Sequence, residues 1–184
     1  MKKSERGQVG LVGEYAVLSA LILHGFNAAR MDGNSKDIDI LCTNSDFSNA
    51  TKIQVKTEGP QAFYRGSKNS SPLYSFFIVT LDKYNHNYRQ AILDQRIYFV
   101  FYLCPQTEAA LASNPFDENR MHGRFFVASP EDIVQQLDAQ ISDNSPKRLY
   151  FRVFSDHDDT RIKYRGGLIS DFENRWDKLT EHWR

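Results

Sequence analysis

Net charge, cysteine and long apolar runs are all scarce in this sequence. The 23 basic residues are matched by 23 acidic residues, so the formal net charge at neutral pH is zero. Such a chain has no global positive field of the kind that draws a protein to nucleic acid regardless of sequence. Any contact with DNA must therefore come from local patches of basic residues.

The cysteines and the apolar runs bear on the compartment. The only two cysteines, Cys42 and Cys104, lie in apolar, strand-like runs, which favours two buried free thiols in a reducing compartment over a disulfide framework. No run approaches the roughly 20 apolar residues that span a bilayer. The apolar stretch near the start contains Glu14 and keeps helical spacing, which is unlike a signal-peptide core. We therefore expect a cytoplasmic protein without a membrane segment.

The length and the periodicity predict one mixed domain. A chain of 184 residues lies within the usual size of a single domain, and we expect one domain over residues 1–184. Apolar residues at helical spacing from Gly10 to His24, followed by Gly25, predict a first helix. Strand-like runs lie at 26–31, 37–42, 52–57, 76–80, 97–103, 124–128 and 148–154, and further helices are expected within 84–95 and at 129–141. Residues 58–73 are typical of an exposed, mobile excursion.

The end of the chain carries an aromatic stripe. Phe172, Trp176, Leu179 and Trp183 recur in helical register, which predicts one closing helix over residues 171–183. Such a stripe more often packs against the protein's own core than against a second copy, although both readings stay open.

Alternation brings three polar residues together. Side chains alternate faces along a strand, so Asp39 opposes Ile38 and Ile40, while Gln54 and Lys56 oppose Ile53 and Val55. If the two runs form a hairpin whose apolar faces share the core, then Asp39, Gln54 and Lys56 lie on the same outer side. There they could converge on a space the size of a metal ion.

The first helix adds a fourth residue with the same chemistry. Glu14 lies on a mostly apolar helix, and a buried acid requires a partner such as Lys56 or a hard divalent cation. Phosphodiester hydrolysis requires a metal that neutralises the phosphate and activates a water, together with a group that orients or deprotonates that water. These residue types supply those parts. A lysine beside a cation has a lowered pKa, which suits a general base or a transition-state stabiliser.

These residues resemble a known family. Gly13-Glu14 in a first helix, Asp37-Ile-Asp-Ile and Ile53-Gln-Val-Lys-Thr57 resemble the active-site pattern of the PD-(D/E)XK nuclease superfamily. The pattern is similar to the variant in which Gln replaces the acid two residues before Lys, as in intron-encoded homing endonucleases. No Pro precedes the Asp, and Gln54 is neutral. The resemblance implies an α/β fold with a restriction-endonuclease-like core, in which helices flank a central mixed β-sheet.

The resemblance also implies an activity and roles for five residues. It implies a metal-dependent endonuclease that hydrolyses DNA phosphodiester bonds with Mg²⁺, for which Mn²⁺ would substitute. Asp39 would bind the metal, Lys56 would lie beside the attacking water, and Glu14 would be an auxiliary acid and metal ligand. Gln54 would be the variant ligand, and the backbone carbonyl of Val55 would touch the metal. A homodimer or higher homo-oligomer would suit an enzyme that has one site and cuts two strands.

Simpler interpretations exist for each residue alone. Glu14 is also typical of an acid near a helix N-terminus, Lys56 and Gln54 of the wet face of an edge strand, and Asp37 and Asp39 of solvated acids near a turn. Only the joint pattern, in the order helix then hairpin, favours a nuclease site. Two alternatives stay open: a catalytically inactive nuclease-fold domain that binds nucleic acid, and a structural protein in which the polar side chains do not converge.

Two further patterns are weaker. The acidic run 156–159 is more typical of a solvated turn than of a metal site. Three basic groups are interleaved with tyrosines and are either phosphate-contacting patches or ordinary surface; they lie at 65–68, 147–152 and 161–165.

Overall fold

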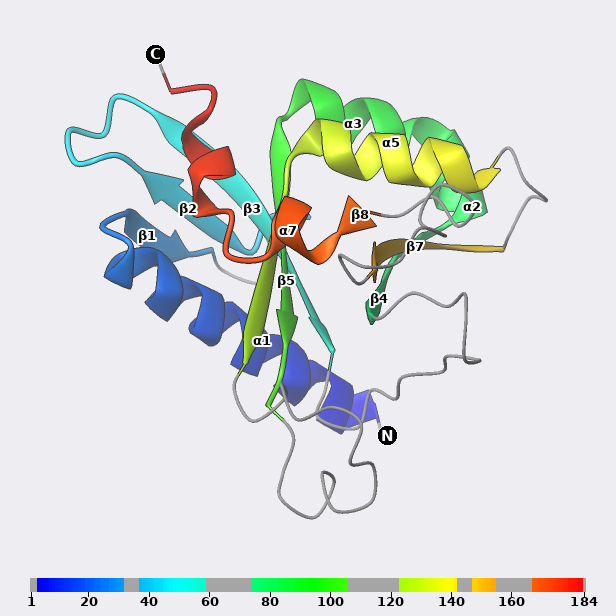
Figure 1. Ribbon diagram of the computed structural model, residues 1–184, viewed down its shortest axis with the longest axis horizontal. Coiled ribbons are helices and arrows are strands. Elements are labelled where there is room, and N and C mark those ends of the chain that lie inside the picture. Colours follow the sequence, from blue (N-terminus) through cyan, green and yellow to red (C-terminus); the bar gives the residue numbers. More distant parts are fainter. Residues whose placement is uncertain are drawn as a thin grey trace.

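The computed structural model describes residues 3–31, 37–58, 74–105, 123–141, 147–154 and 167–183 (Figure 1). Most of the predicted excursion, the acidic run 156–159 and two of the three basic groups lie outside these ranges. Within them, none of the helices combines the length and the hydropathy that crossing a membrane requires.

The first helix, α1, spans Lys3–Leu23 and is longer at its start than the apolar spacing predicts. It ends where predicted. Gly25 has a φ of 86°, and its N–H donates to the carbonyl of Ile22 at 3.0 Å, while the N–H of Phe26 donates to the carbonyl of Leu21 at 3.1 Å. This pair of bonds is the Schellman motif, which a glycine allows because it has no side chain to oppose the left-handed conformation.

A mixed sheet of five strands forms the centre of the molecule, and helices flank it (Figure 1). Its order is β1-β2-β3-β5-β6, and every neighbouring pair is antiparallel except β3 and β5. The strands are β1 Asn27–Arg30, β2 Ile40–Thr43, β3 Ala50–Glu58, β5 Ile97–Leu103 and β6 Arg124–Ala128. The predicted α/β architecture, a central mixed sheet flanked by helices, is confirmed.

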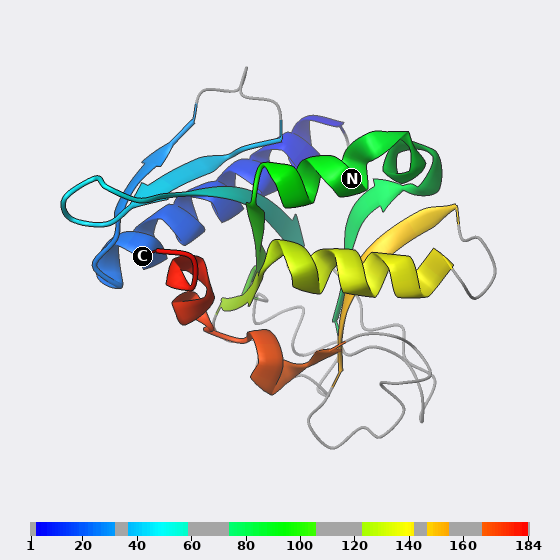
Figure 2. The same cartoon turned by 90° about the horizontal axis from the view of Figure 1, so that it is seen from above.

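A smaller three-stranded sheet, in the order β4-β7-β8, packs beside the first. It consists of β4 Tyr74–Thr80, β7 Arg148–Phe154 and β8 Gly167–Leu168. The remaining elements are α2 Leu81–Lys83, the irregular turn η1 Tyr84–Tyr88, α3 Arg89–Asp94, α5 Pro130–Ile141, α7 Ile169–Phe172 and η3 Trp176–Thr180. Figure 2 shows α3 and α5 running alongside each other over the same part of the molecule.

Two apolar cores lie on opposite faces of the five-stranded sheet. The face here called the α1 face is covered by α1, whose Val17 and Leu21 pack against the strands. The opposite face, here called the η1 face, is covered by η1, α3, α5 and the smaller sheet.

Strand β5 supplies both cores by alternation, and all of its side chains are buried. Phe101 lies on the η1 face, where its ring stacks on Phe151 with centroids 4.1 Å apart. The nearly continuous apolar runs 76–80 and 97–103 are both typical of strands covered on both faces, and this holds for β5. It is wrong for the run 76–80, where Phe77 is 43% exposed.

The two cysteines are as predicted: both are buried and free. Burial raises the pKa of the Cys42 thiol to about 11, so this thiol is protonated at neutral pH.

Helix α5 begins with a reciprocal cap formed by Ser129 and Asp132. The hydroxyl of Ser129 accepts a bond from the N–H of Asp132 at 3.2 Å, and the carboxylate of Asp132 accepts one from the N–H of Ser129 at 2.9 Å. This reciprocal pair satisfies donors that the first turn of a helix otherwise leaves open.

The same helix satisfies backbone groups of β7. Gln140 accepts from the N–H of Tyr150 at 3.1 Å and donates to its carbonyl at 2.6 Å, and Gln136 accepts from the N–H of Arg152 at 2.9 Å. Glutamines four residues apart share a helix face, and residues two apart on a strand share an edge. The two buried amides therefore act as a substitute for a neighbouring strand.

The prediction of one closing helix over residues 171–183 is wrong. Helix α7 ends at Phe172, Glu173 bridges to Phe126 of β6, and Asn174 turns the chain with a φ of 53°. The aromatic stripe is thereby divided between the two cores, with Phe172 on the η1 face and Trp176 on the α1 face. The segment wraps around the β6 edge of the sheet, so the stripe packs on the protein's own core.

Candidate functional site

The site begins where β2 and β3 separate. The N–H of Asp39 donates to the carbonyl of Ile53 at 2.9 Å, which is the last backbone bond between the two segments at this end. The next donor along β3, the N–H of Val55, is taken instead by the carboxylate of Asp39 at 2.7 Å. The side chain of Asp39 therefore replaces the backbone acceptor that a longer β2 would supply. Strand β2 begins at Ile40 and not at the predicted Asp37, because Asp37 has a left-handed φ of 67°.

The structure brings Asp39, Gln54 and Lys56 to one face of the sheet. Ile40 pairs with Ile53, so Asp39 and Gln54 come next in register and share the opposite side. Lys56 follows Gln54 on that side, and its pKa depends on the charge of Asp39. This is the η1 face. The three residues therefore converge as the alternation predicts.

The face on which they lie is not an outer one, and that expectation is wrong. Gln54 is only 6% exposed and Lys56 is partly buried. β3 is an inner strand, and Gln54 and Lys56 pair with Phe99 and Phe101 of β5, which belong to the core of the η1 face. The interpretation of Gln54 and Lys56 as the wet face of an edge strand is excluded for the same reason.

Burial shifts the ionisation of both charged residues against their charged forms. It raises the pKa of Asp39, against the opposing effects of the Val55 N–H and the Lys56 ammonium. It also lowers the pKa of Lys56, against the attraction of Asp39 and Asp37, and the nearby Lys83 lowers it further. The charged forms of Asp39 and Lys56 are therefore both less stable here than in water, even though the two charges attract each other. Shifts of this kind are common at functional sites.

Glu14 reaches this neighbourhood from the opposite face. Helix α1 lies so close to β3 at Gly13 that a Cβ there would overlap the side chain of Thr57, one residue past Lys56. The carboxylate of Glu14 forms an ion pair with Arg30 of β1 at 3.2 Å. Among the described residues, the contacts of Glu14 do not include Asp39, Gln54 or Lys56. The acid thus has a partner, although a different one from the lysine or cation expected.

Two further residues at this site were missed by the sequence reasoning. The hydroxyl of Tyr88 donates to Oε1 of Gln54 at 3.1 Å, and Nζ of Lys83 lies 4.7 Å from the centroid of the Tyr88 ring. Lys83 also forms an ion pair with Asp37 at 3.4 Å. The tyrosine-rich composition of residues 84–95 was the one available signal, and it does not say which ring points inward.

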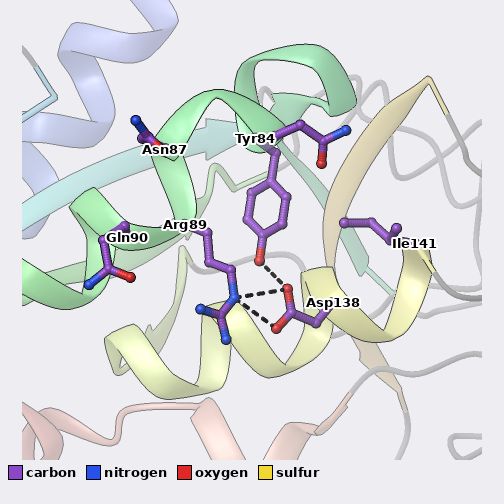
Figure 3. A pocket seen from close by; sticks show the side chains of 7 residues that line it. Tyr84, Asn87, Arg89, Gln90, Asp138 and Ile141 are labelled. Atoms are coloured by element: carbon purple, nitrogen blue, oxygen red, sulfur yellow. Dashed lines mark hydrogen bonds and ion pairs between the residues drawn. The ribbon is translucent and has the colours of Figure 1, made fainter.

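A separate pocket of about 340 Å³ lies on the same segment, between η1, α3 and α5 (Figure 3). Figure 3 shows Tyr84 and Arg89 both pointing at Asp138 of α5. The Tyr84 hydroxyl donates to Asp138 at 2.5 Å, and Nε of Arg89 lies 3.0 Å from the second oxygen of the same carboxylate. These bonds fasten η1 and α3 to α5, so they hold the segment that carries Tyr88.

The oxygen donors at the site fit a cation that keeps most of its water. The Oδ1 atom of Asp39 has no hydrogen bond within the described ranges, and Oε1 of Gln54 keeps a second lone pair besides the one that meets Tyr88. No group of three or more His, Cys, Asp or Glu side chains gathers anywhere in the described part of the chain. Carboxylate and amide oxygens are ligands of the kind that a hard divalent cation takes, with waters completing its coordination shell.

Comparisons with known proteins give a weak structural likeness. No protein-family model matches the sequence. No curated protein matches it either. A solved structure that matches is Hjc, a Holliday junction resolvase from the archaeal hyperthermophile Archaeoglobus fulgidus. The match has 14% sequence identity and a TM-score of 0.38, and it covers 75% of this chain and 86% of that one. At this similarity it assigns neither a substrate nor a residue role to this chain.

Proposed function

We propose that this chain is a metal-dependent endonuclease that hydrolyses DNA phosphodiester bonds at the site formed by Asp39, Gln54 and Lys56. The observation that carries the proposal is their convergence at the point where β2 and β3 separate, with Asp39 fixed to the backbone of Val55 at 2.7 Å. DNA is the proposed substrate because the motif resembles that of the PD-(D/E)XK superfamily. As in that superfamily, Mg²⁺ is the proposed ion and Mn²⁺ its substitute.

Asp39 and Gln54 are the proposed side-chain ligands. The Asp39 carboxylate is held by one oxygen, which leaves the other to bind an ion. The carbonyl of Val55 is a third proposed ligand, and Glu14, which Arg30 holds on the far side of β3, is a proposed auxiliary acid. Bound Mg²⁺ would neutralise the phosphate and lower the pKa of an attacking water.

Lys56 is proposed to lie beside that water. Burial lowers the pKa of its ammonium group, so it gives up a proton more readily than a solvated lysine does. In its charged form the group would hold and orient the water or stabilise the negative charge that develops on the phosphate. In its neutral form it would accept a proton from the water.

The test compares cleavage by the purified chain with cleavage by two site variants. Supercoiled plasmid, linear duplex and single-stranded DNA are incubated with Mg²⁺, with Mn²⁺ and with a chelator, and the products are separated on gels. We expect cleavage with either ion, none with the chelator, and none for Asp39→Ala or Lys56→Ala. Lys52→Ala is the matched control, because it removes a lysine from the same strand and the same alternation phase. Cleavage that survives Asp39→Ala or Lys56→Ala would overturn the site assignment.

A second candidate is a nuclease-fold domain that binds nucleic acid without cutting it. The observation that favours it is that Gln54 is neutral and buried, which leaves Asp39 as the only acid among the proposed ligands on the η1 face. Binding measured by fluorescence anisotropy, together with no cleavage of any substrate under any ion condition, would establish this alternative. A homodimer is the proposed state of either protein, and light scattering during size-exclusion chromatography measures it directly.

A further inference from the structure

Tyr88 makes a direct contact with Gln54, the uncharged side chain among the proposed metal ligands. Its hydroxyl donates to Oε1 of Gln54 at 3.1 Å, and both residues are at most 7% exposed. A tyrosine hydroxyl is protonated at neutral pH, so it can act as the donor in this bond. A carbonyl oxygen accepts a hydroxyl proton and an amide nitrogen does not. By donating its proton to Oε1, the hydroxyl holds the carbonyl end of the Gln54 amide toward it.

The ring of Tyr88 makes a second contact, with a lysine. Nζ of Lys83 lies 4.7 Å from the ring centroid, within the range of a cation–π interaction, and 3.4 Å from a carboxylate oxygen of Asp37. The Lys83 side chain is 52% exposed, so it can leave Asp37 without unfolding anything. It also lies close enough to Lys56 to lower the pKa of that group. Tyr88 thus stands between a buried amide and an exposed cation at the same site.

The chain holds Tyr88 in place independently of the site. Within η1, the helical backbone is broken at His86 and Asn87, and Asn87 has a left-handed φ of 68°. On either side of this break, Tyr84 and Arg89 are bonded to Asp138 of α5 (Figure 3). The anchored flanks and the break between them direct Tyr88 toward β3, while Tyr84 is directed toward α5.

We propose that Tyr88 is a positioning residue of the nuclease site, which orients Gln54 through its hydroxyl and holds Lys83 through its ring as a second cation for the phosphate. This inference rests on the proposed function. The hydroxyl fixes Oε1 with its second lone pair free for a metal ligand bond. On substrate binding, Lys83 exchanges the Asp37 carboxylate for a phosphate oxygen.

The hydroxyl is tested by Tyr88→Phe, which keeps the ring. Mn²⁺ binding to the DNA-free protein is measured by isothermal titration calorimetry and by the loss of the free-ion electron paramagnetic resonance signal. We expect Mn²⁺ affinity to fall roughly 10-fold, the lower end of what loss of a residue that orients a metal ligand usually causes. Tyr74→Phe is the matched control. It removes the hydroxyl of another buried tyrosine, which accepts a bond from Arg124 and lies outside η1, so it should lower stability and leave Mn²⁺ affinity unchanged.

Orientation can be separated from general damage by replacing the amide with a carboxylate. Both ends of a glutamate are oxygen atoms, so a Gln54→Glu chain does not need Tyr88 to choose between them. The loss of Mn²⁺ affinity caused by Tyr88→Phe should therefore be much smaller in the Gln54→Glu background than in the natural sequence. An equal loss in both backgrounds would contradict the orienting role.

The cation is tested by Lys83→Gln with the chelator present, so that neither a metal nor cleavage contributes. Binding of a short DNA duplex is measured by anisotropy over a range of salt concentrations. One lost phosphate contact should reduce the slope of log affinity against log salt by about 0.9. Arg175→Gln is the matched control, because Arg175 forms a similar exposed ion pair, with Asp177, on the C-terminal segment. It should leave the slope unchanged.

The outcomes separate the two proposals. If the natural chain binds Mn²⁺ and cleaves DNA while Tyr88→Phe binds Mn²⁺ equally well, the positioning role of the hydroxyl is wrong and the proposed function stands. If Lys83→Gln leaves the salt slope unchanged, the role of the ring is wrong. If the natural chain neither binds Mn²⁺ nor cleaves DNA, the proposed function fails and the role of Tyr88 fails with it.

Discussion

The carboxylate of Asp39 accepts a hydrogen bond from the backbone N–H of Val55 at 2.7 Å, at the point where β2 and β3 stop pairing. A side chain thus completes a backbone ladder, and the same carboxylate belongs to the proposed site. Its structural and chemical roles can be separated, because an asparagine oxygen can accept the same bond without a charge.

Asp39→Asn should therefore abolish cleavage and still increase stability. Burial raises the pKa of Asp39 above 3.8, so the folded chain binds this proton more tightly than the unfolded chain. Stability then falls as the pH rises through the folded pKa, and the cost is fully present at neutral pH. We expect the free energy of unfolding at pH 7, measured in urea without metal, to be higher for the variant than for the natural chain. The gain should vanish below pH 3.8, where both states are protonated, and a loss of stability at pH 7 would contradict the argument.

The pair Asp39 and Lys56 should behave non-additively. Burial lowers the pKa of Lys56 below 10.5, so at neutral pH its charge also costs stability, and Lys56→Met should stabilise the metal-free chain. Each single variant removes one burial cost and loses the attraction between the two charges. The double variant removes both costs and loses that attraction only once. Its gain should exceed the sum of the single gains by roughly 1 kcal/mol in urea unfolding; additive gains would mean that the two charges do not interact.

The close approach of α1 to β3 predicts opposite effects for two glycines of the same helix. Gly13→Ala places a Cβ within the side chain of the β-branched Thr57 and should destabilise the chain by roughly 1–3 kcal/mol. At Gly10 a Cβ meets nothing within 4 Å, so Gly10→Ala should stabilise the helix by roughly 0.5–1 kcal/mol. Thermal unfolding checks both predictions: the midpoint temperature should be higher for Gly10→Ala and lower for Gly13→Ala than for the natural chain.

The hydrogen bonds between the glutamines of α5 and β7 predict that substitution lowers the stability of the chain at Gln140 but not at Gln135. Gln140→Met keeps the volume and leaves both the N–H and the carbonyl of Tyr150 without their bonds to α5. An unsatisfied buried polar group costs about 1–3 kcal/mol, so we expect a loss of roughly 2–3 kcal/mol in urea. Gln135→Met is the control, because Gln135 is exposed on the same helix. It should change stability by less than about 0.5 kcal/mol.

Local patterns predicted most of the secondary structure. The period-two runs predicted the β2–β3 hairpin and the continuous apolar run predicted β5, because alternation and burial depend on neighbours in the sequence. The closing helix was wrong because Asn174 turns the chain at β6, and that turn depends on a strand distant in sequence. Helical spacing alone could not show that the aromatic stripe is divided between two cores.

The candidate site was likewise predicted only in part from the sequence. Alternation was enough to put Asp39, Gln54 and Lys56 on one face. It could not predict that η1 covers this face, because that packing brings together residues 34 apart in sequence at Tyr88 and Gln54. The ion pair of Glu14 with Arg30 was missed for the same reason, because β1 brings Arg30 to the first helix. The motif alone had suggested Lys56 or a metal ion as the partner of Glu14.

The C-terminal segment also limits how two copies of this chain can join. Glu173 bridges to Phe126, Asn174 donates to the carbonyl of Phe125 at 3.0 Å, and Arg124 holds Glu173 through two bonds of 2.6 and 2.7 Å. The outer edge of β6 is thus already occupied by the chain's own residues, and an occupied edge does not recruit a foreign strand. The other outer strand of the five-stranded sheet is β1, so a second protomer that extended this sheet would pair there. Removal of the residues after Phe172 would expose the β6 edge to the same kind of pairing.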